Sequence, residues 1–283
     1  MRLSQSARRR LSAAFIVLLV ATTAATGCGG GGIGTSTNRL REAQESFNQA
    51  ATAENSLRFD DQLQEGPVQG QLASNTAIQN GYASALLSLG KIEQQDVERL
   101  KTDKLWGNVL ALKALTQWKL GLLDQARQTA AEAQQAGADQ LLPRDQALLL
   151  ALPGLIKVDE AFAALQRVPT DPSAAQRATA LQNVQLLVSD AVNAIDKGRV
   201  AAGTAHPVQV YLIQAELAAF RNLQFAHEAL GEGDDRTLPA AKRADAQRLL
   251  KELKCQTEKL KAPDAIVGYW AGKLTLTPEP GPC

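Results

Sequence analysis

The spacing of apolar residues constrains the fold of this 283-residue chain more than any other feature. From Asn38 onward these residues recur mostly at helical intervals, as Leu40, Phe47 and Ala51 do. Ala and Leu supply most of the apolar surface, and both residues favour helices. Valine, isoleucine and the aromatic residues, which favour strands, form no alternating run before the last twenty residues. The sequence therefore predicts an all-α fold.

Helix-stop signals divide this stretch into segments with short connections. The expected helices cover residues 38–54, 71–89, 96–101, 105–120, 122–136, 143–168, 173–197, 207–230 and 239–261, with a loop at 55–70. We expect Gly90 to end the second of these helices and the Pro153-Gly154 pair to interrupt the sixth. Because no boundary is marked, the sequence predicts one stacked array of antiparallel hairpins over residues 38–262. An extended Pro-rich tail is expected at 263–283.

The first 27 residues have the layout of a secretory signal peptide. Four arginines and no acidic residue accompany an apolar stretch from Ala13 to Ala21, which small residues follow. This stretch is far shorter than the roughly 20 residues that a membrane-spanning helix needs. We therefore expect residues 1–27 to direct export and to be removed. The mature chain then holds 26 basic and 29 acidic residues, a net charge of −3 that gives no general attraction for nucleic acid or anionic lipid.

The residues Ala25-Thr26-Gly27-Cys28 resemble the lipobox of bacterial lipoproteins. The resemblance implies that the sulfur of Cys28 receives a diacylglycerol and that cleavage leaves Cys28 as the lipid-anchored amino terminus. Leu is usual where Ala25 stands, and the alternative is ordinary cleavage near Ala25, which leaves Cys28 as a free thiol. Gly29 after the cysteine implies the outer membrane, facing the periplasm, in a diderm organism. Glycine, serine and threonine predict a flexible tether over residues 28–37.

The other two cysteines, Cys255 and Cys283, form an even pair in a compartment expected to be oxidising. Cys255 lies about 200° round its helix from Leu253, which places it off the apolar stripe and outside the core. We expect an intramolecular disulfide that pins the tail. The alternatives are a free Cys283 and pairing between molecules.

The stretch from Lys119 to Ala126 resembles the turn between the two helices of a tetratricopeptide repeat, a family with about 34 residues per helix pair. Ala114, Ala126 and Ala133 stand where that family has small residues, and Leu110 stands where it has a large one. Three other positions depart from the pattern: Lys113, Gln117 and Ala130. The resemblance implies a repeat-built array over about residues 71–140. The alternative is that Leu-Gly is simply a common helix ending.

No group of side chains has the spacing of a catalytic or metal site, so we expect neither a catalytic residue nor a cofactor. His206 precedes a helix, and His227 lies near the carboxyl end of one, with no ligand spacing between them. The acidic pairs Asp60-Asp61 and Asp234-Asp235 lack the alternation of a calcium loop. Residues 242–261 hold seven basic residues against three acidic ones. A solvated helix face explains them first, and contact with lipid head groups or an acidic partner is the alternative.

These features predict a non-enzymatic envelope lipoprotein whose helical array binds a protein partner or forms part of an assembly. The expected partners are the membrane, through the amino-terminal lipid, and a protein of unknown identity, but not nucleic acid. The alternative, from another class, is a periplasmic small-molecule binder or transport accessory. A closed cavity lined by Trp and Tyr favours the binder, and an open apolar surface favours the protein partner.

Overall fold

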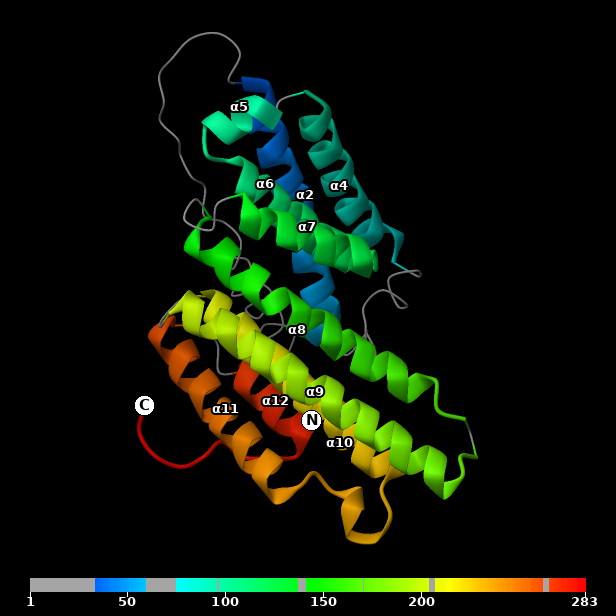
Figure 1. Cartoon of the computed structure of the whole chain (residues 1–283). Helices are drawn as coiled ribbons and strands as arrows, with labels where there is room; N and C mark the ends of the chain where they lie inside the picture. The colour runs from blue at the N-terminus through cyan, green and yellow to red at the C-terminus, as the bar shows by residue number, and fades with distance from the viewer. Residues whose placement is uncertain are drawn as a thin grey trace. The chain divides into compact units, whose positions relative to one another are not determined.

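The computed structural model describes residues 34–59, 75–95, 97–136, 141–169, 171–203, 207–261 and 265–283. Every regular element of these residues is helical, which confirms the predicted all-α fold (Figure 1). The elements are α2 (Gly34–Phe59), α4 (Thr76–Gln95), α5 (Val97–Thr102), α6 (Trp106–Lys119), α7 (Leu123–Gln135), α8 (Pro143–Gln166), α9 (Ala174–Ala202), α10 (Pro207–Leu230), the short 3₁₀ helix η3 (Gly233–Arg236), α11 (Ala240–Lys259) and α12 (Ala265–Leu274). Neighbouring helices pack on one another as hairpins.

The helices group into two compact units. Of the described residues, those from 34 to 149 form unit 1 and those from 150 to 283 form unit 2. The division falls inside α8, whose first turns belong to unit 1 and whose remainder belongs to unit 2. A continuous helix carries no composition change or linker at that point, so the sequence marks no boundary there.

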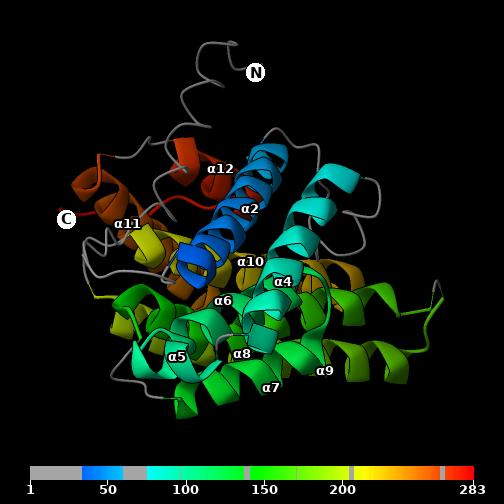
Figure 2. The same ribbon diagram turned by 90° about the horizontal axis from the view of Figure 1, so that it is seen from above.

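Unit 1 is built around the hairpins α2–α4 and α6–α7 (Figure 2). Phe47 of α2 meets Tyr82 of α4 edge to face, with ring centroids 5.2 Å apart. Helix α6 is buried along most of its length because it packs against α4 on one side and α7 on the other. Ala114, Ala126 and Ala133 are fully buried in the α6–α7 hairpin, as small residues at close helix contacts are.

Unit 2 is built around the long hairpin of α9 and α10, against which α11 and α12 also pack. Ser173 caps α9: its hydroxyl accepts from the Gln176 backbone N–H, and the Gln176 side chain accepts from the Ser173 N–H. The core of the hairpin consists of alanine, valine and leucine side chains from both helices. They include Val184, Val188 and Ala191 of α9 and Ala219, Leu223 and Ala226 of α10.

The expected interruption at Pro153-Gly154 is wrong, because α8 runs unbroken from Pro143 to Gln166. Pro153 is exposed, so its ring lies on the solvent side of the helix. Gly154 lies against α9, where an added Cβ would come within 2.5 Å of the Ala191 carbonyl oxygen. Gly154 therefore lets α8 and α9 approach closely, and Pro153 does not end the helix.

Further expectations about helix limits are also wrong, and α9, expected to end at residue 197, runs through Gly198 to Ala202. Residues 265–274 form α12 instead of an extended tail, because Ile266, Val267 and Leu274 share a face that is buried. Helix α4 continues through Gly90 to Gln95. At the amino-terminal end, Gly34–Thr37, expected in the tether, form the first turn of α2, which also continues past residue 54 to Phe59.

Candidate functional site

The densest ionic cluster of unit 2 surrounds Arg199, near the carboxyl end of α9. Its Nε lies 2.8 Å from Glu216 Oε1 of α10, its Nη1 lies 2.7 Å from Glu252 Oε2 of α11, and its Nη2 lies 2.8 Å from Asp196 Oδ1 of its own helix. The side chains of Arg199 and Glu216 are 14% and 2% exposed, so both charges are largely removed from water. One guanidinium thus serves three carboxylates.

The excess of carboxylates over cations affects the pKa values of the cluster. Burial raises the pKa of Glu216 to about 8, against the attraction of Arg199, and the negative charges of Asp196 and Glu252 add to the rise. Burial alone would lower the pKa of Arg199, but its three carboxylate partners outweigh that effect and raise it. The folded cluster therefore favours a protonated Glu216 at neutral pH.

A carboxyl group with a raised pKa is typical of a general acid in catalysis. A general acid must touch its substrate, however, and Glu216 is almost completely enclosed. Instead, Arg199 pairs with carboxylates of α9, α10 and α11 and so links the three helices. We therefore interpret the Arg199 cluster as a structural feature that holds three helices of unit 2 together.

Unit 1 holds a second enclosed polar group, centred on Glu54 of α2. Its carboxylate accepts a 2.7 Å hydrogen bond from the Tyr82 hydroxyl of α4 and pairs with Lys119 Nζ of α6 at 2.9 Å. The Lys119 ammonium also lies 4.4 Å from the centroid of the Trp118 ring. Because each polar atom meets a partner from another helix, this group fixes the packing of α2, α4 and α6.

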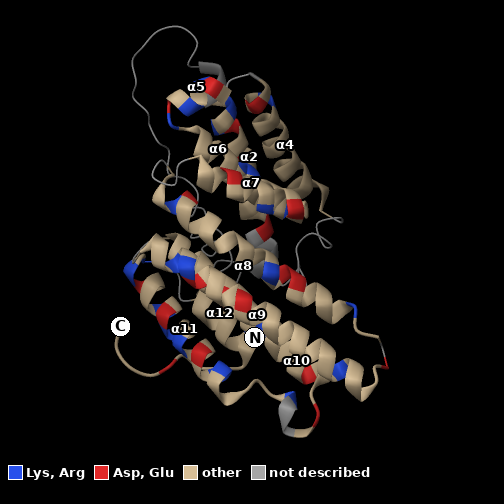
Figure 3. Ribbon diagram, in the orientation of Figure 1, with Lys and Arg blue, Asp and Glu red and all other residues tan. Residues whose placement is uncertain are grey.

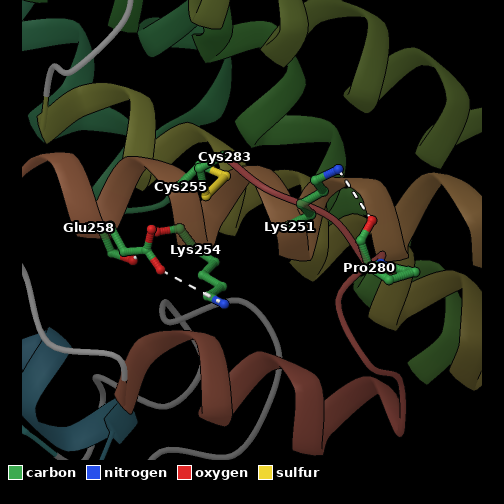
Figure 4. Close-up of a disulfide and its surroundings, with 7 residues drawn as sticks. Lys251, Lys254, Cys255, Glu258, Pro280 and Cys283 are labelled. Atoms are coloured by element: carbon green, nitrogen blue, oxygen red, sulfur yellow. Dashed lines mark hydrogen bonds and ion pairs between the residues drawn. A yellow bond between two sulfur atoms is a disulfide. The ribbon is translucent and has the colours of Figure 1, made fainter.

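The structure joins Cys255 and Cys283 in a disulfide, with their Cα atoms 5.3 Å apart (Figure 4). Two further contacts hold the tail along α11. The Glu279 N–H donates to the Gln247 carbonyl oxygen at 3.1 Å, and Lys251 Nζ donates to the Pro280 carbonyl oxygen at 3.4 Å. The last residues of the chain are thus attached to the outward side of α11.

The other residues singled out by sequence do not come together. Cys28, His206 and Asp60-Asp61 lie outside the described residues. His227 is buried, with its Nε2 3.5 Å from the side-chain nitrogen of Gln185. Among the residues that the structure describes, no group of three or more His, Cys, Asp or Glu side chains is arranged to hold a metal ion.

Sequence reasoning missed both enclosed polar groups. Arg199 and Asp196 are three positions apart on α9 and could be paired from sequence, but Glu216 and Glu252 look like ordinary surface acids. One signal was present. Glu216 stands among the apolar residues of α10, which are buried on most sides, and a carboxylate there needs a partner.

Two uncharged stretches on exposed helix faces complete the candidate surfaces. Residues 75–90 of α4 and its cap contain no charged residue, and neither do residues 178–189 of α9. Each stretch has a leucine in solvent: Leu87 is 63% exposed and Leu186 is 60% exposed. Depletion of charge together with exposed apolar side chains is the composition of an interface core.

No protein-family model matches the sequence, and comparison with curated proteins and with solved structures finds no match. Among the described helices, none is both long enough and apolar enough to cross a membrane.

Proposed function

We propose that this chain is an exported lipoprotein, anchored through acylated Cys28, whose helical domain binds a protein partner without catalysing a reaction. The observation that carries the first part is the order of residues 1–37: arginines, a short apolar stretch, Thr26-Gly27-Cys28 and a run of glycines. A diacylated cysteine holds a protein stably at a membrane, whereas a single chain does not.

The partner-binding part is supported by the uncharged faces of α4 and α9. Exposed Leu87 and Leu186 would each desolvate on contact with another apolar surface, which is the main source of binding free energy in interfaces. Both enclosed polar groups fasten helices to one another, which gives each unit a rigid surface to present. Rigid helical arrays bind partners through such surfaces at little cost in ordering.

Metabolic labelling with a fatty-acid probe tests the anchor. The wild-type chain should incorporate the probe and partition with membrane, and Cys28→Ser should do neither. Equal labelling of both proteins, or none in either, would exclude acylation at Cys28.

Pull-down from detergent-solubilised envelope tests the partner. We expect a protein that co-purifies in stoichiometric amount with the wild-type chain and is lost in Leu87→Glu or Leu186→Glu. Lys197→Gln, a change at an exposed charged position of α9, is the matched control and should retain it. A partner that survives both leucine changes, or no partner at all, would contradict this use of the two faces.

A further inference from the structure

After α12 ends, the chain returns along α11, and we call this returning segment, residues 275–283, the strap. It meets α11 at three positions that follow one another at intervals of four residues: Gln247, Lys251 and Cys255 (Figure 4). The first two contacts are the hydrogen bonds described above, and the third is the disulfide. Residues spaced by four lie on the same side of a helix, so the strap covers one side of α11.

Little other than the disulfide holds the strap in place. Leu276 and Pro278 are half-buried, and the other residues of the strap are exposed. Glu279 is its one charged side chain, and α11 carries charges of both signs, so electrostatic attraction between the two is weak (Figure 3). The hydrogen bond from Lys251 is exposed, and water competes for both of its partners. The bond between the cysteines is therefore the main attachment of the strap.

The strap begins at a residue with an unfavourable backbone conformation. Thr275 follows directly after α12 and has a φ of 55°, in the left-handed region. The Leu276 N–H donates to the Ala271 carbonyl oxygen at 3.0 Å, a turn that usually has glycine where Thr275 stands. A residue with a Cβ is disfavoured there by about ten-fold or more. This turn directs the chain back toward α11, so the bond that holds the strap also holds Thr275 in its strained conformation.

The disulfide is accessible to a reductant from one side. Cys283 is exposed, whereas Cys255 is half-buried. Thiol–disulfide exchange requires that a thiolate reach one of the two sulfur atoms, and exposed disulfides are the labile ones. Cys283 is therefore the point of attack, and Cys255 is the leaving group.

We propose that this bond is a redox-sensitive switch, which a dithiol reductant opens in the folded protein so that the strap leaves α11 while the helices of unit 2 remain packed. A thiolate of the reductant attacks Cys283 Sγ, the S–S bond breaks, and Cys255 Sγ leaves as a thiolate. The second sulfur of the reductant then attacks the mixed disulfide and releases Cys283. Both electrons come from the reductant, which ends as a disulfide, and its two thiol protons end on the two cysteines.

The release stops at α12, which has its own contacts with the rest of the unit. Ile266, Val267 and Leu274 are buried, and Trp270 Nε1 donates to the Gln214 side-chain oxygen of α10 at 3.2 Å. These contacts do not involve the strap, so α12 stays on α10 after reduction. Unit 2 thus has an oxidised state in which this side of α11 is covered, and a reduced state in which it is open and two thiols are available.

Reduction of the whole purified chain with dithiothreitol, without denaturant, tests the switch. Alkylation and peptide mapping should find thiols at both Cys255 and Cys283, while the circular dichroism spectrum stays unchanged. Hydrogen exchange should become faster at the Glu279 amide, which loses its Gln247 acceptor, and should stay unchanged in α9 and α10. Cysteines that are alkylated only in urea, or faster exchange throughout α9 and α10, would overturn the proposal.

Two matched variants, Thr275→Gly and Thr277→Gly, test the strained turn. Thr277 is also exposed, but its φ is not positive. Both substitutions give the released strap the same extra freedom, whereas only Thr275→Gly relieves strain in the oxidised state. The equilibrium constant for reduction by dithiothreitol should therefore be about ten-fold smaller for Thr275→Gly than for Thr277→Gly, a difference of about 30 mV.

Equal constants in the two variants would also overturn the proposal, because Thr275 would then keep its conformation without the strap. The purified chain is assayed without membrane or partner, so the outcome is independent of the proposed anchor and of the proposed protein partner.

Discussion

Glu216 places a carboxyl group where α9, α10 and α11 meet, and its surroundings favour the uncharged form. Transfer of a carboxylate out of water costs several kcal/mol unless its partners compensate fully. Arg199 compensates in part, but it also serves Glu252 and Asp196. Removing Arg199 would leave three acids without their shared cation, whereas neutralising Glu216 would relieve the surplus. The two changes should therefore act in opposite directions above neutral pH.

The pH dependence of stability follows from the raised pKa of Glu216. The folded group holds its proton up to about pH 8, while the unfolded group releases it near 4.5. The unfolded state therefore binds fewer protons between these values, and the free energy of unfolding falls as pH rises, by up to about 1.4 kcal/mol per pH unit. Below about pH 4.5 the contribution is complete.

Urea unfolding of the wild type and Glu216→Gln across this range measures the effect. The Gln variant should lose much of the dependence and become relatively more stable as the solution becomes alkaline. Titrating groups elsewhere act equally on both proteins and cancel in the difference. Parallel curves for the two proteins would show that Arg199 keeps Glu216 ionised throughout.

Two glycines in helices should respond oppositely to alanine. Gly154 of α8 has Ala191 O, Ile195 Cγ1 and Ile195 N within 3.0 Å of the position of an added Cβ. Gly154→Ala should therefore destabilise by roughly 1–3 kcal/mol or more through overpacking. Gly90→Ala, in α4 with open space around the added methyl, should stabilise by up to about 1 kcal/mol because alanine favours helix. The shift of the denaturant midpoint at unchanged slope measures the change in unfolding free energy of each variant. If Gly154→Ala does not lower the stability, α8 must lie farther from α9 than in this structure.

At the scale of elements, the Cys255–Cys283 bond constrains the tail and the segment that contains α12. The bond closes a loop with a sequence separation of 28 that contains α12. Helix α12 has only ten residues, and a helix of this length is marginal without tertiary contacts. Its packing on α10 includes a 3.2 Å hydrogen bond from Trp270 Nε1 to the Gln214 side-chain oxygen.

Loss of the disulfide should destabilise the protein by roughly 3–4 kcal/mol on the chain-entropy model. Cys255→Ser and Cys283→Ser should give the same loss of unfolding free energy, and hydrogen exchange should become faster in α12 first. Mass spectrometry of the non-reduced wild-type protein provides the control, since it should show no free thiol at either position. A covalent dimer would instead favour pairing between molecules.

Helix positions were largely predictable because each helix needs only local signals. The expected span 207–230 coincides with α10, and the limits of α6, α7 and α11 agree within two residues. The predictions at Pro153 and Gly90 were wrong because a local rule treats proline and glycine as helix stops. Whether the helix continues depends on the surroundings of each residue in the folded chain, and both helices continue. The sequence did not predict α12 because its pattern of apolar residues extends over only ten residues and prolines follow it. What covers its apolar face is α10 and α11, which only the folded chain brings near.

At the scale of the whole molecule, the partners of side chains from distant helices could not be predicted. Glu54, Tyr82 and Lys119 are each unremarkable in sequence, and their contact depends on how three helices pack. The same holds for the division inside α8, because compactness depends on contacts and not on composition. Net charge of each segment, by contrast, is read directly from sequence.

The last prediction is that the helical domain folds without its anchor. Every described helix begins at or after Gly34, and the buried side chains of both units come from those helices and their connections, so the described cores are built from residues that follow Cys28. Residues 28–283 with Cys28→Ser should therefore be soluble, strongly helical by circular dichroism and cooperative in urea unfolding. The free energy of unfolding should match that of the acylated chain in detergent within about 0.5 kcal/mol, the usual effect of a change remote from the core. A large sheet signal would contradict the architecture, and a chain that unfolds without its lipid would show that membrane contact is part of the fold.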